Sequence, residues 1–182
     1  MNKIRNIMSW YKITQQLQAI AHTNAKDGKI YAFLDMDGVV NVFFPEGTPE
    51  YAYRLEHQND EMCMADRAGV KRLSKLFIQN DIYVVISSTW RLDGIDFCRT
   101  YLEKAGMDKR VHIVDGTPYM PQSCREMEIV TYLLEHQDFK QFIILDDMAM
   151  PHLKKHLLHC DCTKGYTEEL HQRAERLLND HA

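Results

Sequence analysis

Short apolar segments alternate with amphipathic segments along most of this chain. The apolar segments, rich in β-branched and aromatic residues, are 30–34, 82–86, 111–114, 142–145 and 157–160. Segments with helical spacing of apolar residues follow them at 66–79, 94–105, 123–136 and 167–179. Continuous apolar strands separated by helices are typical of a parallel sheet covered on both faces. The sequence therefore predicts an α/β, Rossmann-like fold.

Local signals predict where some of these helices begin and end. Ser123 and Glu126, in "SCRE", form the pattern of a capping box, which predicts the start of the helix over 123–136. Gly106 predicts the end of the helix over 94–105, because glycine readily adopts the left-handed conformation that ends helices.

An additional amphipathic helix is expected within residues 1–28, before the first strand. Its apolar positions have roughly helical spacing and are Ile4, Ile7, Met8, Tyr11, Leu17 and Ile20. The simplest interpretation is that this helix packs on its own domain. The alternative is a homodimer contact made through the same helix.

Length and composition limit the class of protein. A chain of 182 residues suits one domain, so we expect residues 1–182 to form a single unit. No apolar run reaches the roughly 18 to 20 residues of a membrane helix, and the N-terminus lacks the apolar core of a secretion signal. The five cysteines are odd in number and do not resemble a disulfide framework. We therefore expect a cytoplasmic protein with reduced thiols and no membrane partner.

Charge and metal-ligand spacing exclude further classes of function. The net charge of −4 offers no broad basic face, which disfavours extended non-specific binding to nucleic acid. "HCDC" at 159–162 could suggest a metal clip, but no second Cys/His pair stands at zinc spacing. We therefore expect Cys160 and Cys162 to be buried structural residues.

Polar residues gather where the predicted strands end. The first strand runs into Asp35 and Asp37, the second into "SSTWR" at 87–91, and the fourth into Asp146 and Asp147, while Arg125 lies in the first turn of the helix before the fourth strand. Function in a parallel sheet lies at the carboxyl ends of the strands, near the point where the strand order reverses. The sequence therefore predicts that these acids, hydroxyls and cations share one site.

This set of residues has a chemical logic. Several carboxylates cannot remain charged together without a cation, and oxygen ligands favour Mg²⁺. Beside the metal, Asp35 can act as a nucleophile and Asp37 as an acid and base. Ser87 can donate a hydrogen bond to a phosphoryl oxygen, and Arg125 can neutralise its charge.

The neighbouring residues have supporting roles in this interpretation. Gly38 would let the chain turn sharply beside the metal. Ser88, through its backbone N–H or its hydroxyl, and Arg91 could reach a bound phosphate, although Arg91 could instead brace the lid. Trp90 is expected to pack rather than to stack on a substrate. The structural alternatives are turn or cap roles for the acids and serines, and an ion pair of Arg125 with a glutamate of its own helix.

Residues 41–65 interrupt the regular alternation directly after the first strand. The segment contains three Gly/Pro residues and four aromatic residues, which are Phe43, Phe44, Tyr51 and Tyr53. An insertion at this place lies over the site side of a parallel sheet, so we interpret it as a small cap or lid. Its aromatic residues either form ordinary core or stack on a base or sugar of the substrate.

The sequence "DMDG", a strand ending in Ser87, a basic residue before a helix and "ILDD" together resemble the four motifs of the haloacid dehalogenase (HAD) superfamily of Mg²⁺-dependent phosphohydrolases. The resemblance extends from Ile30 to the C-terminus. It implies a five-stranded sheet of order 5-4-1-2-3, with Asp35 as nucleophile and Asp37 as acid and base. It also implies Ser87 and Arg125 as phosphate-binding residues. The implied metal ligands are Asp35, the backbone carbonyl of Asp37, Asp146 and Asp147.

A narrower resemblance rests on "SSTWR", "CREMEIVTYLLE", "FIILDD" and "TKGYT". These segments are similar to the small-capped HAD domains of Swiss Army Knife RNA repair proteins, whose presumed activity is removal of terminal phosphates from polynucleotides. The third-motif cation of HAD enzymes is commonly Lys, whereas this chain has Arg125, which keeps the charge and adds a bidentate fork.

Three functions are compatible with these residues. The first is an enzyme that hydrolyses a phosphomonoester on a small molecule, nucleotide or nucleic-acid end. The second is a protein that binds a phosphorylated ligand or signalling nucleotide without efficient turnover. The third is a partner-docking role for the N-terminal helix. Receiver domains carry a similar residue set, but their acid pair lies on the first strand and their acceptor Asp on a later one, the reverse of the order here.

Overall fold

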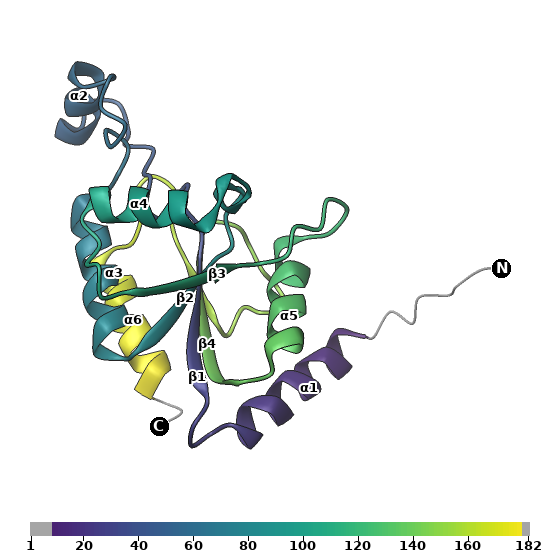
Figure 1. Cartoon of the computed structure of the whole chain (residues 1–182). Helices are drawn as coiled ribbons and strands as arrows, with labels where there is room; N and C mark the ends of the chain where they lie inside the picture. The colour runs from purple at the N-terminus through teal and green to yellow at the C-terminus, as the bar shows by residue number, and fades with distance from the viewer. Residues whose placement is uncertain (1–8, 180–182) are drawn as a thin grey trace.

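Five parallel strands form the centre of the structure, a computed structural model that describes residues 9–179 (Figure 1). The strands of this described part are β1 (Lys29–Leu34), β2 (Ile82–Ile86), β3 (His112–Gly116), β4 (Phe139–Asp146) and β5 (Leu157–His159). All neighbouring pairs are parallel, and the order is β3-β2-β1-β4-β5. This is the predicted order 5-4-1-2-3 read from the other edge. The α/β class and the sheet topology are therefore confirmed.

Alternate residues of the strands point to two separate cores. In β1, Ala32 and Leu34 belong to one buried cluster, and Tyr31 and Phe33 belong to the other. This is the period of two that a pleated strand imposes on its side chains. The near-continuous apolar strands thus result from burial on both faces.

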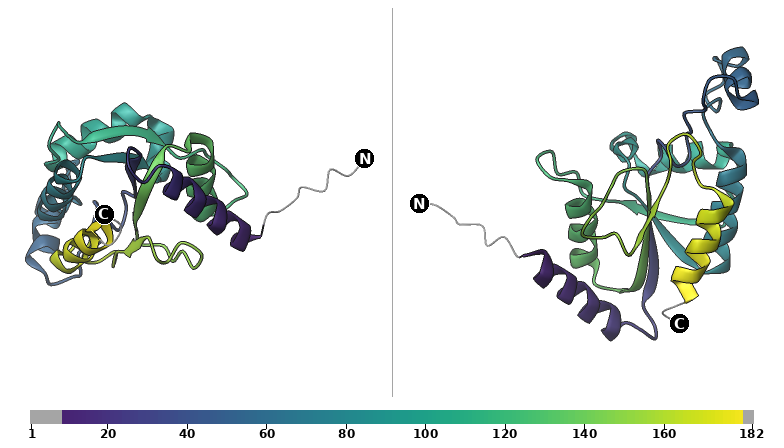
Figure 2. Two further views of the ribbon diagram at one scale, coloured as in Figure 1. Left: turned by 90° about the horizontal axis from the view of Figure 1, so that it is seen from below. Right: turned by 180° about the vertical axis from the view of Figure 1, so that it is seen from behind.

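Helices cover both faces of the sheet, as the two rotated views show (Figure 2). The core with Leu34 includes residues of α3 (Arg67–Gln79), α4 (Ile95–Ala105) and α6 (Glu168–Asn179). The core with Phe33 includes residues of α1 (Trp10–Thr23) and α5 (Arg125–His136). Among the described residues, no helix combines the length and the apolar character that a membrane span requires.

The N-terminal helix is present, and part of its predicted apolar face packs on the domain, since Leu17 is buried and Ile20 is partly buried against the Phe33 core. Ile4, Ile7 and Met8 lie outside the described residues. In α1, Ile13 and Leu17 are buried against the domain, whereas Tyr11 is 71% exposed. Tyr11 precedes Ile13 by two residues, which places it on the far side of a helix with 3.6 residues per turn. The assignment of Tyr11 to the packed face was therefore wrong.

The predicted capping box of α5 is also wrong. The helix begins at Arg125, its N-cap is Cys124, and no side chain caps it. The Glu126 carboxylate instead accepts hydrogen bonds from the backbone amides of His152 (2.8 Å) and Leu153 (3.1 Å), and lies 2.9 Å from the His152 ring. A buried carboxylate is costly unless it is hydrogen-bonded, and the amides of this loop supply the hydrogen bonds. The Glu126 side chain is therefore turned to the loop and does not cap its own helix. Gly106 does end α4, at φ 111°, as predicted.

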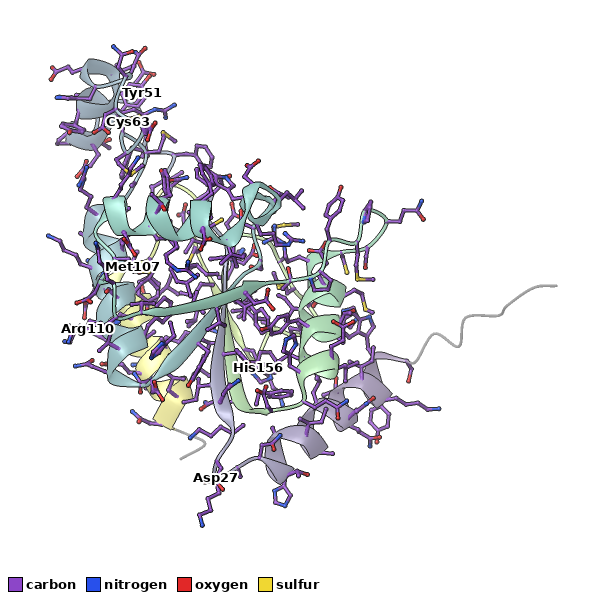
Figure 3. All side chains as sticks on the ribbon, viewed as in Figure 1. Asp27, Tyr51, Cys63, Met107, Arg110 and His156 are labelled. Atoms are coloured by element: carbon purple, nitrogen blue, oxygen red, sulfur yellow. The ribbon has the colours of Figure 1, made fainter. Side chains whose placement is uncertain are left out.

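The insertion after β1 leaves and rejoins the domain at one place. Asn41 bridges Ala65 in antiparallel fashion, and the Val42 amide donates to the Met64 carbonyl (2.8 Å). Between these ends lies α2 (Pro49–Glu56), which has no buried residue. Figure 3 labels Tyr51 and Cys63 on this projecting segment. We call residues 41–65 the cap.

Candidate active site

The hydrogen-bond ladder of the sheet brings the polar strand ends together. Leu34 of β1 is in register with Leu145 of β4, and the Asp35 amide donates to the Leu145 carbonyl (3.0 Å). On the other side of β1, the Ser87 amide donates to the Leu34 carbonyl (2.9 Å). The strand order reverses between β1 and β4, so Asp35 and Asp146 meet at the switch point.

Three carboxylates form a cluster at this edge. Asp35, Asp146 and Asp147 each offer an oxygen within 4.8 Å of the others. Burial and the neighbouring Asp35 charge raise the pKa of Asp146 to about 7, and the same two causes raise the pKa of Asp147. Such crowded carboxylates are stable together only with positive charge beside them.

Arg125 supplies part of that charge from the first turn of α5. Its Nη1 lies 2.8 Å from Asp146 Oδ2 and 3.3 Å from Asp35 Oδ1. The guanidinium thus bridges the carboxylates that end two adjacent strands. The alternative, in which Arg125 pairs only with a glutamate of its own helix, is wrong. Glu128 is a more distant partner, at 3.9 Å.

Gly38 permits Asp147 to approach the cluster. A Cβ at this position would lie 2.4 Å from Asp147 Oδ2. The φ of +81° is also one that residues other than glycine rarely adopt. The turn predicted at Gly38 is therefore present, and its role is to leave room for a carboxylate.

The Ser87 hydroxyl is buried without a hydrogen-bond partner among the described residues. A buried polar group of this kind is rare and requires an explanation. The neighbouring Ser88 differs, because its hydroxyl accepts a long hydrogen bond (3.5 Å) from the Trp90 amide and caps the 3₁₀ helix η1 (Thr89–Asp93). Of the two serines, Ser88 is engaged as an acceptor within its own loop, whereas the Ser87 hydroxyl has no partner among the described residues and both its donor and its acceptor positions are open to a ligand.

The Arg91 guanidinium binds groups of the protein itself. Its buried guanidinium donates to the backbone carbonyls of Ser87 (2.7 Å), Ser88 (2.7 Å) and Thr117 (2.7 Å), and pairs with Glu128 (2.9 Å). With its donors directed to these groups, Arg91 holds the loop after β2 against the loop after β3. The assignment of Arg91 to substrate binding is corrected accordingly, and none of the hydrogen bonds or ion pairs of its guanidinium among the described residues is with residues 41–65.

Asp37 lies beside the carboxylate cluster but its side chain belongs to another network. Trp90 Nε1 donates to Asp37 Oδ2 (2.9 Å), and Asn41 Nδ2 donates to Asp37 Oδ1 (3.1 Å). The carboxylate is therefore separate from the group formed by Asp35, Asp146 and Asp147. This leaves only the backbone carbonyl of Asp37 for the metal role that the family resemblance implies.

Comparison with known proteins identifies the family. Residues 31–170 match the model of the HAD domain in Swiss Army Knife RNA repair proteins. The chain belongs to this HAD family. The search of curated proteins and the search of solved structures each gave no match. The suspected resemblance is confirmed, and with it the broad assignment to HAD-type hydrolases.

The donor set of this HAD domain fits a hard divalent cation. The cluster contributes carboxylate oxygens only, which is the ligand type that Mg²⁺ prefers. The space that Gly38 leaves for Asp147 further supports a built site. Asp35, Asp146 and Asp147 are the residues that would hold such an ion.

Three residues of the site escaped sequence reasoning about function. Trp90 packs against Phe97 and Tyr101, as expected of a packing residue, but its N–H also binds Asp37. The sequence placed Asn41 only at the start of the cap and Tyr101 only within a predicted helix. One local signal pointed to a role in the site for Trp90 and Asn41, because Trp90 follows Ser87 by three residues and Asn41 follows Asp37 by four.

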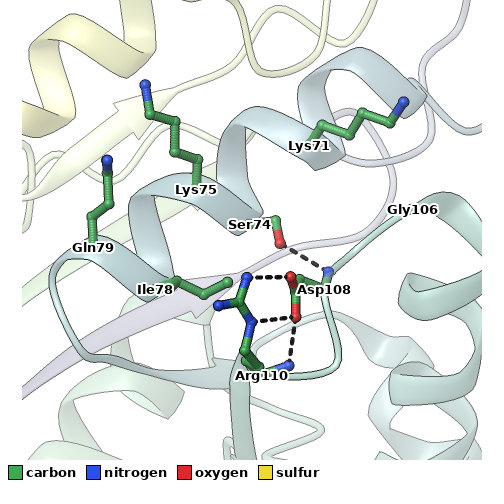
Figure 4. Close-up of a pocket in the computed structure, with 8 residues that line it drawn as sticks. All are labelled: Lys71, Ser74, Lys75, Ile78, Gln79, Gly106, Asp108 and Arg110. Carbon is green, nitrogen blue, oxygen red and sulfur yellow. Dashed lines mark hydrogen bonds and ion pairs between the residues drawn. The ribbon is translucent and has the colours of Figure 1, made fainter.

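Two hollows formed by the described residues lie outside the candidate site. One of about 410 Å³ lies between α3 and residues 106–110, where Asp108 pairs with Arg110 (Figure 4). Another of about 1000 Å³ lies between α1, β4 and residues 151–156. Neither is lined by a predicted site residue, so the catalytic interpretation rests on the strand ends alone.

Proposed function

We propose that this HAD domain is a Mg²⁺-dependent phosphatase that hydrolyses a phosphomonoester at the end of a nucleotide or polynucleotide. The observation that carries the proposal is the meeting of the Asp35, Asp146 and Asp147 carboxylates with Arg125 at the switch point. The unpaired Ser87 hydroxyl beside them supports a phosphoryl group as the ligand.

In the first step, a carboxylate oxygen of Asp35 attacks the phosphorus, and the bond from phosphorus to the leaving oxygen breaks. Asp37 gives a proton to that oxygen, which departs as an alcohol. Ser87 donates a hydrogen bond to a phosphoryl oxygen, and Arg125 offsets the charge of the others. The product of this step is an aspartyl-phosphate on Asp35.

In the second step, Asp37 accepts a proton from a water molecule that attacks the same phosphorus. The bond between phosphorus and the Asp35 oxygen breaks, which releases inorganic phosphate and restores the carboxylate. Mg²⁺ bound by Asp35, Asp146, Asp147 and the Asp37 carbonyl would supply positive charge to the phosphoryl oxygens in both steps.

The surroundings of the site favour a substrate larger than its phosphate. Large exposed hydrophobic residues follow four different strands, at the edge where the carboxylates lie, and they are Phe43, Leu92, Phe97, Tyr119 and Met148. The cap helix α2 has no buried residue, so it does not enclose the site. An open site with apolar surface around it suits the base and sugar of a nucleotide end.

The direct test is phosphate release from p-nitrophenyl phosphate, nucleotides, sugar phosphates and oligonucleotides phosphorylated at either the 3′ or the 5′ end. Asp35→Asn should abolish release and EDTA should stop it, whereas Asp161→Asn, at an exposed acid outside the site, should leave it unchanged. Equal rates for Asp35→Asn and the unaltered protein would refute the mechanism. Co-purification of a phosphorylated ligand with no turnover would instead favour the binding-protein function.

A further inference from the structure

The Asp37 carboxylate is held at both of its oxygens by side chains from two other segments. Trp90, in η1 after β2, donates its indole N–H to Oδ2 at 2.9 Å. Asn41, at the start of the cap, donates its amide N–H to Oδ1 at 3.1 Å. An indole nitrogen can only donate, so the direction of this hydrogen bond does not depend on the choice of a tautomer.

The orientation of the Asn41 amide is fixed by a third residue. The Tyr101 hydroxyl donates to Asn41 Oδ1 at 2.5 Å, which leaves the NH₂ end of the amide facing Asp37. Burial raises the pKa of Tyr101 to about 12, so the hydroxyl keeps its proton at neutral pH. The same hydroxyl lies 3.5 Å from the Glu61 carbonyl oxygen, in the returning end of the cap.

The aromatic residues of this network also pack on one another. The ring of Trp90 meets the ring of Tyr101 edge to face at 4.8 Å and that of Phe97 at 5.9 Å. Tyr101 is therefore in contact with both donors of Asp37. Asn41 comes from the cap, Trp90 from η1 and Tyr101 from α4. The first two bind the Asp37 carboxylate, and Tyr101 contacts both of them.

We propose that Trp90 and Asn41 are positioning residues that aim the Asp37 carboxyl at the leaving oxygen, and that Tyr101 couples their alignment to the base of the cap. The proposal rests on the function proposed above, in which Asp37 is the acid and base. None of the three residues is assigned contact with the substrate. Their effect is to select one orientation of a carboxyl group that would otherwise rotate freely about its side-chain bonds.

The energetic reason is that proton transfer depends on geometry. A general acid contributes roughly 10²- to 10⁴-fold to a rate, and only when it lies within hydrogen-bond reach of the leaving oxygen. Two fixed donors reduce the entropy that the carboxyl must lose in the transition state. Removal of a donor should therefore matter most for substrates whose leaving group needs a proton.

The test compares two phosphomonoesters with Trp90→Phe. p-Nitrophenyl phosphate has a leaving group stable as an anion and needs little general acid, whereas an alkyl phosphate such as β-glycerophosphate needs the proton. We expect the single-turnover rate of aspartyl-phosphate formation from the alkyl ester to fall about 10- to 100-fold, a fraction of the general-acid contribution, and that from the nitrophenyl ester to change by less than about threefold. The second step, in which Asp37 acts as base, is common to both esters, so it is kept out of this comparison. KM should change little for both esters.

Two further variants separate positioning from folding. Tyr101→Phe removes one hydroxyl and keeps the aromatic packing, so it should reproduce the same dependence on leaving group to a smaller extent. Trp10→Phe, at the other tryptophan of the chain, on α1, should affect neither ester. In the Asp37→Asn background, Trp90→Phe should cause no additional loss, because the group it positions is already unable to act.

The outcomes distinguish this inference from the function on which it rests. If Asp37→Asn slows aspartyl-phosphate formation according to leaving group but Trp90→Phe and Tyr101→Phe slow it equally for both esters, positioning is refuted and the proposed phosphatase mechanism stands. An unaltered protein that hydrolyses neither these two esters nor any nucleotide, sugar phosphate or oligonucleotide of the panel above overturns both proposals. If Trp90→Phe fails to fold, the Tyr101→Phe result decides.

Discussion

At the scale of single residues, the Ser87 hydroxyl is notable because it is buried and has no partner among the described residues. Burial of a hydroxyl without a hydrogen bond costs about 1 to 3 kcal/mol, so its removal should not destabilise the fold. We predict that Ser87→Ala unfolds in urea with a free energy within about 1 kcal/mol of the unaltered protein or higher. The same variant should lose about 10²-fold in kcat/KM, by analogy with removal of an oxyanion donor. A large loss of stability with normal kcat/KM would contradict this role.

Arg91 should behave in the opposite way. Its guanidinium is buried among three backbone carbonyls and Glu128, so a substitution removes hydrogen bonds from those carbonyls and the nearest cation from the Glu128 carboxylate, for which Arg125 is more distant at 3.9 Å. Arg91→Met should lower the free energy of unfolding by about 3 to 5 kcal/mol. Activity measured well below the unfolding midpoint should show little change in KM. A higher KM with normal stability would restore Arg91 as a substrate ligand.

At the scale of elements, α1 contributes to the core that lies on the Phe33 face of the sheet. Leu17 is 5% exposed, and its truncation leaves a cavity between α1 and the rest of that core. We predict that Leu17→Ala costs about 2 to 4 kcal/mol. The matched substitution Tyr11→Ala, at a residue 71% exposed on the same helix, should change stability by no more than about 0.5 kcal/mol. Denaturant unfolding of both variants measures the difference, and equal losses would mean that α1 is not packed as described.

A homodimer through α1 stays a prediction. The buried positions of this helix face its own domain, which leaves the exposed side, including Tyr11, as the available contact surface. Molar mass in solution, measured for the unaltered protein and Tyr11→Ala, tests it. A dimer that is lost in the variant supports the contact, and a monomer in both removes it.

Sequence reasoning succeeded where a single local pattern determines the structure. The apolar runs predicted the strands, and the resemblance to HAD proteins implied the sheet order that the structure has. It failed where a side chain chooses a partner far along the chain. Glu126 binds the loop after β4 rather than its own helix end, and Trp90 reaches Asp37 across 53 positions. The spacing of neighbouring residues cannot predict such a partner, because the partner depends on which distant segments the fold brings together.

At the scale of the whole molecule, folding brings together the three carboxylates of the proposed metal site from two strand ends, so a cation bound there should stabilise the fold. Mg²⁺ that binds only the folded state adds about 2.7 kcal/mol at a concentration 100-fold above its dissociation constant. We predict a higher thermal midpoint with Mg²⁺ for the unaltered protein and for Asp161→Asn, and no such increase for Asp147→Asn. An equal increase in all three would place the cation elsewhere.

The most direct test of the central claim is to trap the covalent intermediate. The protein is mixed with a phosphomonoester and Mg²⁺, quenched in acid within the first turnover, and digested for mass spectrometry. We predict a phosphoryl group on the peptide that contains Asp35, its absence when EDTA replaces Mg²⁺, and its absence in Asp35→Asn. Phosphate release without any phosphorylated Asp35 peptide, or with the group on another residue, would contradict the assignment of Asp35 as the nucleophile.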